Sequence, residues 1–339
     1  MKPHLSRCVL LCLGWFAFVA TGHAADETGL RLEAFPYPAP EQLFRFESQQ
    51  QPLEMVYLDY QPAGAPRGTV VLLHGKNFSS SYFGETAEAL RHAGYRVIAP
   101  DQIGFGKATK PAHYQFTLHQ LAHNTRALLA SLGVRRAHIL GHSMGGMLAT
   151  RYALLFPDET ASLVLVNPIG LEDWQALGVP YTTVDDNYRQ ELAKTPEQIR
   201  TYQLESYYDG RWRPAYDPWV EQLASFSRSP AYPRMAWIQA LTSDMVFTQP
   251  VVHEFDQLTV PTLLIIGQRD RTAIGKAAAP AALRRRLGDY PALGRAARAA
   301  IRGSQLVELD DVGHLPHIEA FDRFLPPLRR FLDAQPAGG

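Results

Sequence analysis

Cysteine is almost absent from the 339-residue chain. The two cysteines, Cys8 and Cys12, both lie in an apolar segment near the N-terminus. If that segment is removed after export, the mature chain can form no disulfide and has neither a thiol nucleophile nor cysteine ligands for a metal. Any nucleophile of the mature chain must therefore be another type of side chain.

A net charge is also missing, since 33 Lys and Arg residues balance 33 Asp and Glu residues. This balance provides no electrostatic footprint for nucleic acid or for an anionic membrane surface, so we expect neither as a partner. The chain has no internal repeat and no long low-complexity tract. With 46% hydrophobic residues, its length fits one large domain, or one domain that carries an inserted lobe.

An uncharged apolar stretch covers residues 8–20 and follows Lys2 and Arg7. Small residues come next and permit cleavage after Ala24 or one residue later. This order is typical of a secretory signal, so we predict that residues 1–24 are a signal peptide. The protein is then expected to be exported, either to the periplasm or out of the cell.

Two other interpretations explain this segment less well. An uncleaved membrane anchor needs roughly 20 apolar residues, and the stretch is shorter than that. A lipoprotein would be processed at Cys12, but the bulky Leu11 precedes it where a small residue is expected. We therefore expect no stable membrane span after cleavage.

Short apolar runs alternate with helical patterns through most of the chain. The runs predict buried strands, and they cover residues 68–73, 96–100, 137–140, 161–166, 262–266 and 305–309. Segments with helical spacing lie between them or follow them, at residues 82–93, 117–132, 146–155 and 321–331. This alternation predicts an α/β fold with a doubly wound, mostly parallel sheet. Residues 53–60 predict an early strand, and residues 26–51 predict an irregular arm.

The alternation stops over residues 169–255, which are rich in Tyr, Trp and Pro and contain helical pieces. We interpret this segment as a helical lid inserted into the sheet domain. The core then comprises residues 25–168 and 256–339. Some of the aromatic side chains of the lid are expected to face a cleft and to favour an apolar or aromatic substrate.

The pattern G-x-S-x-G occurs at residues 141–145, between a predicted strand and a predicted helix. A strand that leads into a glycine-flanked serine and then into a helix is the signature of a nucleophile elbow. Gly141 and Gly145 leave room for a cramped turn, and the helix N-terminus directs partial positive charge at an oxyanion. Ser143 is therefore the predicted nucleophile.

A general base is needed to take the proton of Ser143, and His314 is the candidate. It follows the last predicted strand, in a loop at the carboxyl end of the sheet, where ligands of open α/β folds bind. There its imidazole could take the serine proton and later return it to the leaving group. His317 is the competing base and is interpreted as a residue on the rim of the site.

The base in turn needs an acid that holds its tautomer. Asp270 directly follows the strand predicted over residues 262–266, and the chain order Ser, Asp, His is the order of this architecture. Asp270 is the predicted third member of the triad. Glu172 and Asp173, which follow the preceding strand, are the alternative source of the carboxylate.

The oxyanion needs two hydrogen-bond donors. One is the backbone N–H of Met144, the residue after the nucleophile, and the other comes from the loop after an early strand. In that loop Lys76 is the predicted donor through its backbone N–H, with Asn77 as the second choice. His74 in the same loop is interpreted as structural, bonded within the loop.

Five motifs carry a resemblance to a known family. They are HG at residues 74–75, DQIGFG at 101–106, GHSMGG at 141–146, GQRD at 267–270 and GH at 313–314. Together they make residues 50–333 resemble the lidded α/β-hydrolases, which include esterases, carbon–carbon bond hydrolases, haloalkane dehalogenases and epoxide hydrolases. The resemblance implies an α/β-hydrolase fold with a lid. It also implies that Asp101 and residues 104–106 shape a turn near the site and are not catalytic.

The chain departs from two branches of this group at the elbow. Dehalogenases and epoxide hydrolases carry Asp where this chain has Ser143, so an alkyl-enzyme intermediate on a carboxylate is not expected. Proline iminopeptidases usually carry Trp after the serine, where this chain has Met144. Peptidase action is therefore a minor alternative.

We predict a serine hydrolase that cleaves an ester or related acyl bond of a small molecule through an acyl-enzyme. No motif for a metal, a nucleotide or a flavin is present, so no cofactor is expected. Carbon–carbon bond hydrolysis, acyl transfer, lactone hydrolysis and perhydrolysis use a similar triad and stay open, although predicted export disfavours the first. A non-catalytic protein that binds its ligand at a retained triad is a further alternative. The sequence predicts neither the exact substrate nor the oligomeric state.

Overall fold

The computed structural model describes residues 29–335. The predicted signal peptide, residues 1–24, lies outside this part of the chain. None of the helices within residues 29–335 is long and apolar enough to cross a membrane.

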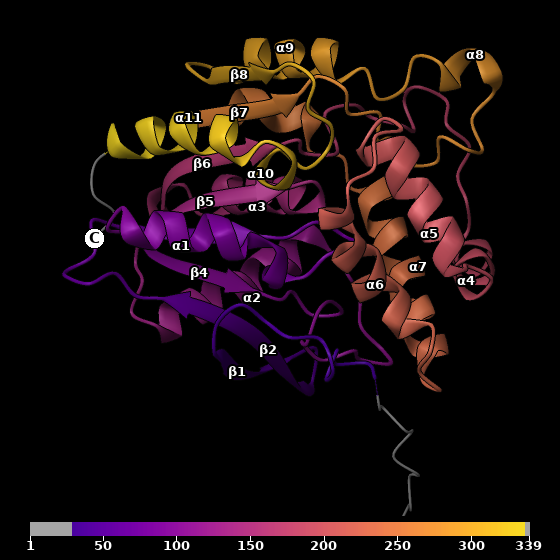
Figure 1. Cartoon of the computed structure of the whole chain (residues 1–339), viewed down its shortest axis with the longest axis horizontal. Helices are drawn as coiled ribbons and strands as arrows, with labels where there is room; N and C mark the ends of the chain where they lie inside the picture. The colour runs from indigo at the N-terminus through magenta and orange to yellow at the C-terminus, as the bar shows by residue number, and fades with distance from the viewer. Residues whose placement is uncertain (1–28, 336–339) are drawn as a thin grey trace, which may run out of the picture.

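An eight-stranded sheet forms the centre of the fold (Figure 1). The strands are β1 Glu41–Ser48, β2 Gln51–Tyr60, β3 Thr69–Leu73, β4 Arg96–Pro100, β5 Ala137–His142, β6 Thr160–Val166, β7 Thr262–Gly267 and β8 Gln305–Leu309. Their spatial order is β1-β2-β4-β3-β5-β6-β7-β8. The β1–β2 and β2–β4 pairs are antiparallel, and every other neighbouring pair, from β4 to β8 in this order, is parallel. The predicted α/β fold with a mostly parallel sheet is therefore confirmed.

Helices cover both faces of this sheet. The helices of the sheet domain are α1 Gly84–His92, α2 Leu118–Ser131, α3 Met144–Leu155, α8 Ala281–Arg284, α9 Tyr290–Ala300, α10 Pro316–Glu319 and α11 Phe321–Asp333. Figure 1 shows α1 and α11 together in front of the sheet, with α2 and α3 behind it.

The two-sided covering follows from the alternation of side chains along each strand. In β3, Val71 and Leu73 pack in one hydrophobic core with residues of α2, α3 and α9. Val70 and Leu72 point the other way and pack with residues of α1 and α11. All five residues of β3 are buried, which explains why its sequence is a continuous apolar run.

Between β6 and β7 the chain contains helices and no strand. The helices are α4 Val184–Leu192, α5 Pro196–Tyr202, α6 Asp217–Phe226 and α7 Tyr232–Thr248, and a π-helical turn covers Gln203–Tyr207. Figure 1 shows them gathered at one end of the sheet. We call residues 169–255 the lid segment below.

The arm predicted as irregular over residues 26–51 contains a strand, so that prediction was wrong. Strand β1 pairs antiparallel with β2, from Glu41 opposite Leu58 to Ser48 opposite Gln51. It is an edge strand with mostly exposed side chains, so it lacks the apolar run that marks a buried strand. The hairpin turn at Gln49 and Gln50 has positive φ at both residues without the Asn or Gly that usually signals such a turn.

Candidate active site

Ser143 lies on the turn between β5 and α3, with φ 57° and ψ −123°. This left-handed conformation is rare outside glycine and is found preferentially at functional sites. A Cβ on Gly141 would lie 2.0 Å from the Gly145 carbonyl oxygen, and a Cβ on Gly145 would lie 2.0 Å from the Leu73 carbonyl oxygen. Both flanking glycines are therefore required for the chain to make this turn beside β3.

His314 and Asp270 form a buried pair at the carboxyl end of the sheet. His314 Nδ1 lies 2.6 Å from Asp270 Oδ2, and neither side chain is exposed. A carboxylate accepts hydrogen bonds, so the proton of the neutral ring is on Nδ1 and Nε2 has the free lone pair. Asp270 follows β7, and His314 follows β8, which explains how residues 44 positions apart meet.

Two further groups hold Asp270 in place. The Nδ2 of Asn167 donates to Asp270 Oδ2 at 2.9 Å, and the backbone N–H of Thr272 donates to Asp270 Oδ1 at 2.8 Å. Asn167 Oδ1 also accepts a hydrogen bond from the Gly267 N–H at 2.8 Å. The side-chain amide of Asn167 therefore holds both ends of the turn after β7, Gly267 and Asp270. Sequence reasoning missed Asn167. The signal for it was its place directly after a strand, at the same edge as the predicted triad.

The ring nitrogen that faces away from Asp270 is unbonded. His314 Nε2 is buried and has no hydrogen-bond partner within residues 29–335. No hydrogen bond therefore joins it to Ser143, whose residue is 5% exposed. In unliganded enzymes such contacts are often long, and they tighten when substrate binds.

A chain of hydrogen bonds connects the loop after β3 to the histidine loop through the elbow. The Gly75 N–H donates to Tyr82 Oη at 2.9 Å, and Tyr82 Oη lies 2.8 Å from His142 Nδ1. On the other side of the ring, His142 Nε2 donates to the His314 carbonyl at 2.8 Å. Burial, with His314 and His317 nearby, holds the pKa of His142 well below its usual range. The ring is therefore neutral, and Tyr82 donates its hydroxyl proton to Nδ1.

Tyr207 of the lid segment covers His314. The two rings stack with centroids 4.6 Å apart and an interplanar angle of 21°. The Tyr207 carbonyl accepts the His314 N–H at 2.8 Å, and its hydroxyl accepts Asn77 Nδ2 at 2.8 Å. A Cβ on Gly313 would lie 1.9 Å from that carbonyl oxygen, so only glycine fits there. Sequence reasoning treated the lid aromatics as a group and had no signal to single out Tyr207.

The predicted oxyanion donors lie beside the elbow. Met144 is the first residue of α3, so its N–H is among the helix amides that have no partner inside the helix. A Cβ on Gly75 would lie 3.0 Å from Ser143 Cβ, which places the loop containing Lys76 against the elbow. Asn77, the second choice as donor, uses its side chain to bind Tyr207.

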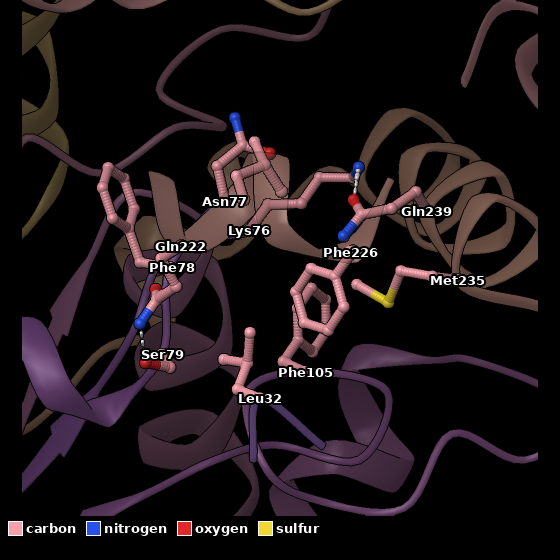
Figure 2. A pocket seen from close by; sticks show the side chains of 12 residues that line it. Leu32, Lys76, Asn77, Phe78, Ser79, Phe105, Gln222, Phe226, Met235 and Gln239 are labelled. Atoms are coloured by element: carbon pink, nitrogen blue, oxygen red, sulfur yellow. Dashed lines mark hydrogen bonds between the residues drawn. The ribbon is translucent and has the colours of Figure 1, made fainter. Parts of the chain in front are cut away.

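The side chain of Lys76 points to the lid segment. Its Nζ donates to Gln239 Oε1 of α7 at 2.5 Å, as Figure 2 shows. Burial lowers the pKa of the Lys76 ammonium to about 8, and Glu191 and Lys194 act on it in opposite directions. The backbone of Lys76 thus lies next to the elbow, while its charged side chain is partly buried against the lid segment.

His317 is not on the rim as predicted. It is 2% exposed and packs against the rings of Tyr82, Phe83 and His142. Burial lowers its pKa to about 3. His317 lies on the short helix α10, which turns its ring inward toward Phe324 of α11, with ring centroids 6.0 Å apart.

The alternative acids, Glu172 and Asp173, and the loop histidine, His74, form hydrogen bonds outside the His314–Asp270 pair. Glu172 Oε1 accepts the Gly288 N–H and Trp174 Nε1, while Asp173 Oδ2 lies 2.7 Å from His253 Nε2. Neither carboxylate bonds to His314. His74 accepts the Gln102 N–H at Nε2 and bonds to the Gly75 carbonyl through Nδ1, which fits the structural role expected of it.

Asp101 shapes the turn after β4. Its carboxylate accepts the backbone N–H groups of Ser80 and Lys107, each at 2.7 Å. A Cβ on Gly106 would lie 2.2 Å from Asp101 Oδ2. Within residues 29–335, no group of three or more His, Cys, Asp or Glu side chains is placed to hold a metal ion.

Several known proteins with similar sequences or structures are named as hydrolases or as a lipase. The family model of the α/β hydrolase fold matches residues 68–321. The crystal structure of a probable hydrolytic enzyme from Pseudomonas aeruginosa superposes with a TM-score of 0.88, at 55% identity, and covers 90% of this chain and 97% of that chain.

Curated relatives differ in the reaction that their names give. Lipase 1 of Psychrobacter immobilis is 26% identical over 294 residues, which cover 83% of this chain and 82% of the lipase. A 2-hydroxy-6-oxononadienedioate/2-hydroxy-6-oxononatrienedioate hydrolase of Paraburkholderia phymatum is 28% identical over 221 residues, which cover 62% of this chain and 74% of that enzyme. The match to the family model over most of the chain decides the assignment: the chain belongs to the α/β-hydrolase fold family and is a hydrolase.

Proposed function

We propose that the chain is a serine esterase that cleaves a small carboxylic ester through an acyl-enzyme on Ser143. The observation that carries this proposal is the buried His314–Asp270 pair, with Nδ1 and Oδ2 2.6 Å apart and with His314 Nε2 left unbonded. His142, the residue before Ser143, bonds through Nε2 to the His314 carbonyl at 2.8 Å, and the backbone of Ser143 itself is held at φ 57°. A serine and a histidine oriented by a carboxylate are the parts of an activated nucleophile.

In the proposed reaction His314 Nε2 takes the hydroxyl proton while Ser143 Oγ attacks the ester carbonyl. Asp270 stabilises the charged imidazole through Nδ1 and stays ionised. The tetrahedral oxyanion accepts hydrogen bonds from the backbone N–H groups of Met144 and Lys76. His314 then gives this proton to the oxygen of the leaving alcohol, and the bond between that oxygen and the former carbonyl carbon breaks, which leaves the acyl group on Ser143 Oγ.

Water completes the cycle in the second half of the reaction. His314 removes a proton from water, which attacks the acyl-enzyme carbonyl, and the proton returns to Ser143 Oγ as the acid leaves. Tyr207 stacks on His314 and limits the access of bulk solvent to this ring. His314 thus acts first as base and then as acid in each half of the reaction.

Hydrolysis of a carbon–carbon bond next to a ketone is the second candidate function. The relative from Paraburkholderia phymatum is named as a hydrolase of that class, and it matches 62% of this chain. Lactone hydrolysis and acyl transfer would use the same side chains. A non-catalytic ligand-binding role is the remaining alternative.

The experiment compares wild type with Ser143→Ala on a panel of short 4-nitrophenyl esters, a lactone, an amide and a vinylogous 1,5-diketone. We expect ester turnover in wild type and a loss of at least about 10³-fold in Ser143→Ala. Wild-type turnover of the diketone alone would replace the ester proposal with the carbon–carbon one. Equal ester turnover in both proteins would contradict the role of Ser143.

We also propose that the protein is exported and loses residues 1–24. This proposal rests on the charged, apolar and small-residue order of the N-terminal sequence. Intact mass measurement of the protein isolated from its native host tests it. A mature N-terminus at residue 25 or 26 supports export, and a full-length chain recovered with cytoplasmic markers contradicts it.

A further inference from the structure

A pocket of about 210 Å³ lies between the Lys76 loop and the lid segment. We call it the Lys76 pocket, and the residues of its lining that matter here are Lys76, Glu191, Lys194, Ile199, Gln203 and Ile274. Its volume is below the roughly 300–1,000 Å³ of sites that take whole drug-sized ligands. It therefore fits one short portion of a substrate.

The charged side chains that line the pocket, Lys76, Glu191 and Lys194, have a net positive charge. Glu191 Oε2 lies 2.6 Å from Lys194 Nζ, so these two residues form an ion pair. The Lys76 ammonium has a neutral acceptor, Gln239 Oε1, and no residue in 29–335 forms an ion pair with it. Glu191 acts on this cation from a distance but is paired with Lys194. A partly buried cation without an ion-pair partner is costly, and an anionic ligand would offset that cost.

A second observation points into the same pocket. The side chain of Gln203 is fully buried, and neither its Nε2 nor its Oε1 has a hydrogen-bond partner within residues 29–335. Buried polar groups are nearly always bonded, so an orphaned amide that lines a pocket is a candidate ligand contact. Gln203 begins the π-helical turn that ends at Tyr207, and such turns are frequent at functional sites.

The pocket is tied to the candidate active site through both of these residues. Lys76 carries the proposed oxyanion N–H on its backbone and reaches the pocket with its side chain. Tyr207, four residues after Gln203, stacks on His314. A group in the pocket therefore lies within about one lysine side-chain length of the reacting carbonyl, and Ile199 and Ile274 provide apolar wall for the methylenes between them.

We propose that the Lys76 pocket binds a carboxylate on the acyl chain of the substrate, held by Lys76 Nζ and Gln203 Nε2. The inferred substrate is thus an ester of a short dicarboxylic acid whose second carboxyl group is free. This substrate class rests on the proposed ester hydrolysis at Ser143. The anion site itself rests on Lys76, Gln203 and the net positive charge of the pocket.

The kinetic test uses two esters that differ by one charge: mono-4-nitrophenyl glutarate and its methyl ester. The quantity measured is the ratio of their kcat/KM values within each protein, so that a general loss of activity cancels. We expect wild type to favour the anion about 10- to 100-fold, as for a hydrogen bond between charged groups. Lys76→Met should lose this preference, and Gln203→Leu should lose part of it.

Lys276→Met is the matched control, because it removes one lysine charge outside the pocket. Its ratio should stay within about twofold of the wild-type ratio. An unchanged ratio in Lys76→Met, or a wild-type preference for the neutral ester, would overturn the proposal. A preference for an ammonium-bearing ester would instead assign the pocket to Glu191 and would also overturn it.

The wild-type protein offers a test that needs no variant at Lys76. Since burial lowers the pKa of the Lys76 ammonium to about 8, its charge is present at pH 7 and is lost as the pH rises through 8. The preference for the anionic ester should therefore fall between about pH 7 and about pH 9.5. Glu191 and Lys194 are the other charged groups that act on Lys76. A ratio that stays constant would contradict the proposal.

Binding separates this inference from the proposed function. Calorimetry compares monomethyl glutarate with dimethyl glutarate on Ser143→Ala, which requires no turnover. Tighter binding of the monoanion that disappears in the Ser143→Ala/Lys76→Met double variant supports the anion site even if no ester is cleaved. Equal binding of the two ligands to Ser143→Ala overturns the anion site while leaving ester hydrolysis intact.

Discussion

The ring of Tyr207, from the lid segment, stacks on the ring of His314 at 4.6 Å. The same residue accepts the His314 N–H with its carbonyl oxygen at 2.8 Å. One lid residue therefore contacts the proposed base through both its side chain and its backbone. This contact makes the position of the lid segment and the orientation of the histidine interdependent.

Replacing Tyr207 separates its two side-chain contacts. Tyr207→Phe keeps the ring and loses the bond to Asn77, so we expect a loss of about 1 kcal/mol in the free energy of unfolding. Tyr207→Ala also removes the ring and should cost about 3–5 kcal/mol. Its kcat/KM should fall further than that of Tyr207→Phe, because His314 loses its stacking partner. Urea unfolding and ester kinetics check both, and equal kinetics in the two variants would contradict the role of the ring.

Asp270→Asn tests the orientation of the base. An amide at this position can present a donor to His314 Nδ1 and so favour the wrong tautomer. We expect kcat to fall by a factor on the order of 10⁴, with the fold retained by circular dichroism. Glu172→Gln is the control, since Glu172 was the alternative acid and bonds elsewhere. A large loss in the control with little loss in Asp270→Asn would reassign the carboxylate.

Tyr82→Phe tests the hydrogen-bond chain between the two loops. The change leaves the Gly75 N–H and His142 Nδ1 without their partner in a buried place. We expect a loss of about 1–3 kcal/mol in the free energy of unfolding, together with lower kcat. Tyr60→Phe is the matched control, because the buried Tyr60 hydroxyl has no partner in residues 29–335. Equal losses in the two variants would show that the chain of bonds contributes nothing.

The close packing at the elbow predicts that residue 145 must be glycine. In Gly145→Ala the new Cβ would lie 2.0 Å from the Leu73 carbonyl oxygen, and neither atom can move away without a shift of the backbone. We expect a loss of at least about 3 kcal/mol in stability, or a failure to fold. Gly64→Ala is the control, since nothing lies within 4 Å of its Cβ. Soluble yield and unfolding in urea measure the difference, and a stable, active Gly145→Ala protein would refute this packing.

The sequence was sufficient for the features that depend on local patterns. Buried strands such as β3 are continuous apolar runs, so the sheet could be predicted from them. The turn at Ser143 requires glycines within two residues, so it also leaves a local signature. Asp270 and His314 follow strands β7 and β8 directly, and parallel strands bring their carboxyl ends together at one edge.

The remaining features depend on contacts between distant segments. Asn167 and Tyr207 became visible only when β6 and the lid segment were placed against Asp270 and His314. His317 was misplaced because its burial depends on how α10 packs, which no short pattern records. Strand β1 was missed because an edge strand is largely exposed and its turn at Gln49 and Gln50 lacks the usual residues.

Labelling with a fluorophosphonate, followed by peptide mass mapping, is the most direct test of the central claim that Ser143 is an activated nucleophile. We predict one adduct per chain, located on Ser143, with loss of ester turnover in proportion to labelling. In His314→Gln the rate of labelling should fall by at least about 10²-fold, since the base would be missing. A preparation that hydrolyses esters and shows no adduct on Ser143, or that keeps its turnover when fully labelled there, would contradict the account.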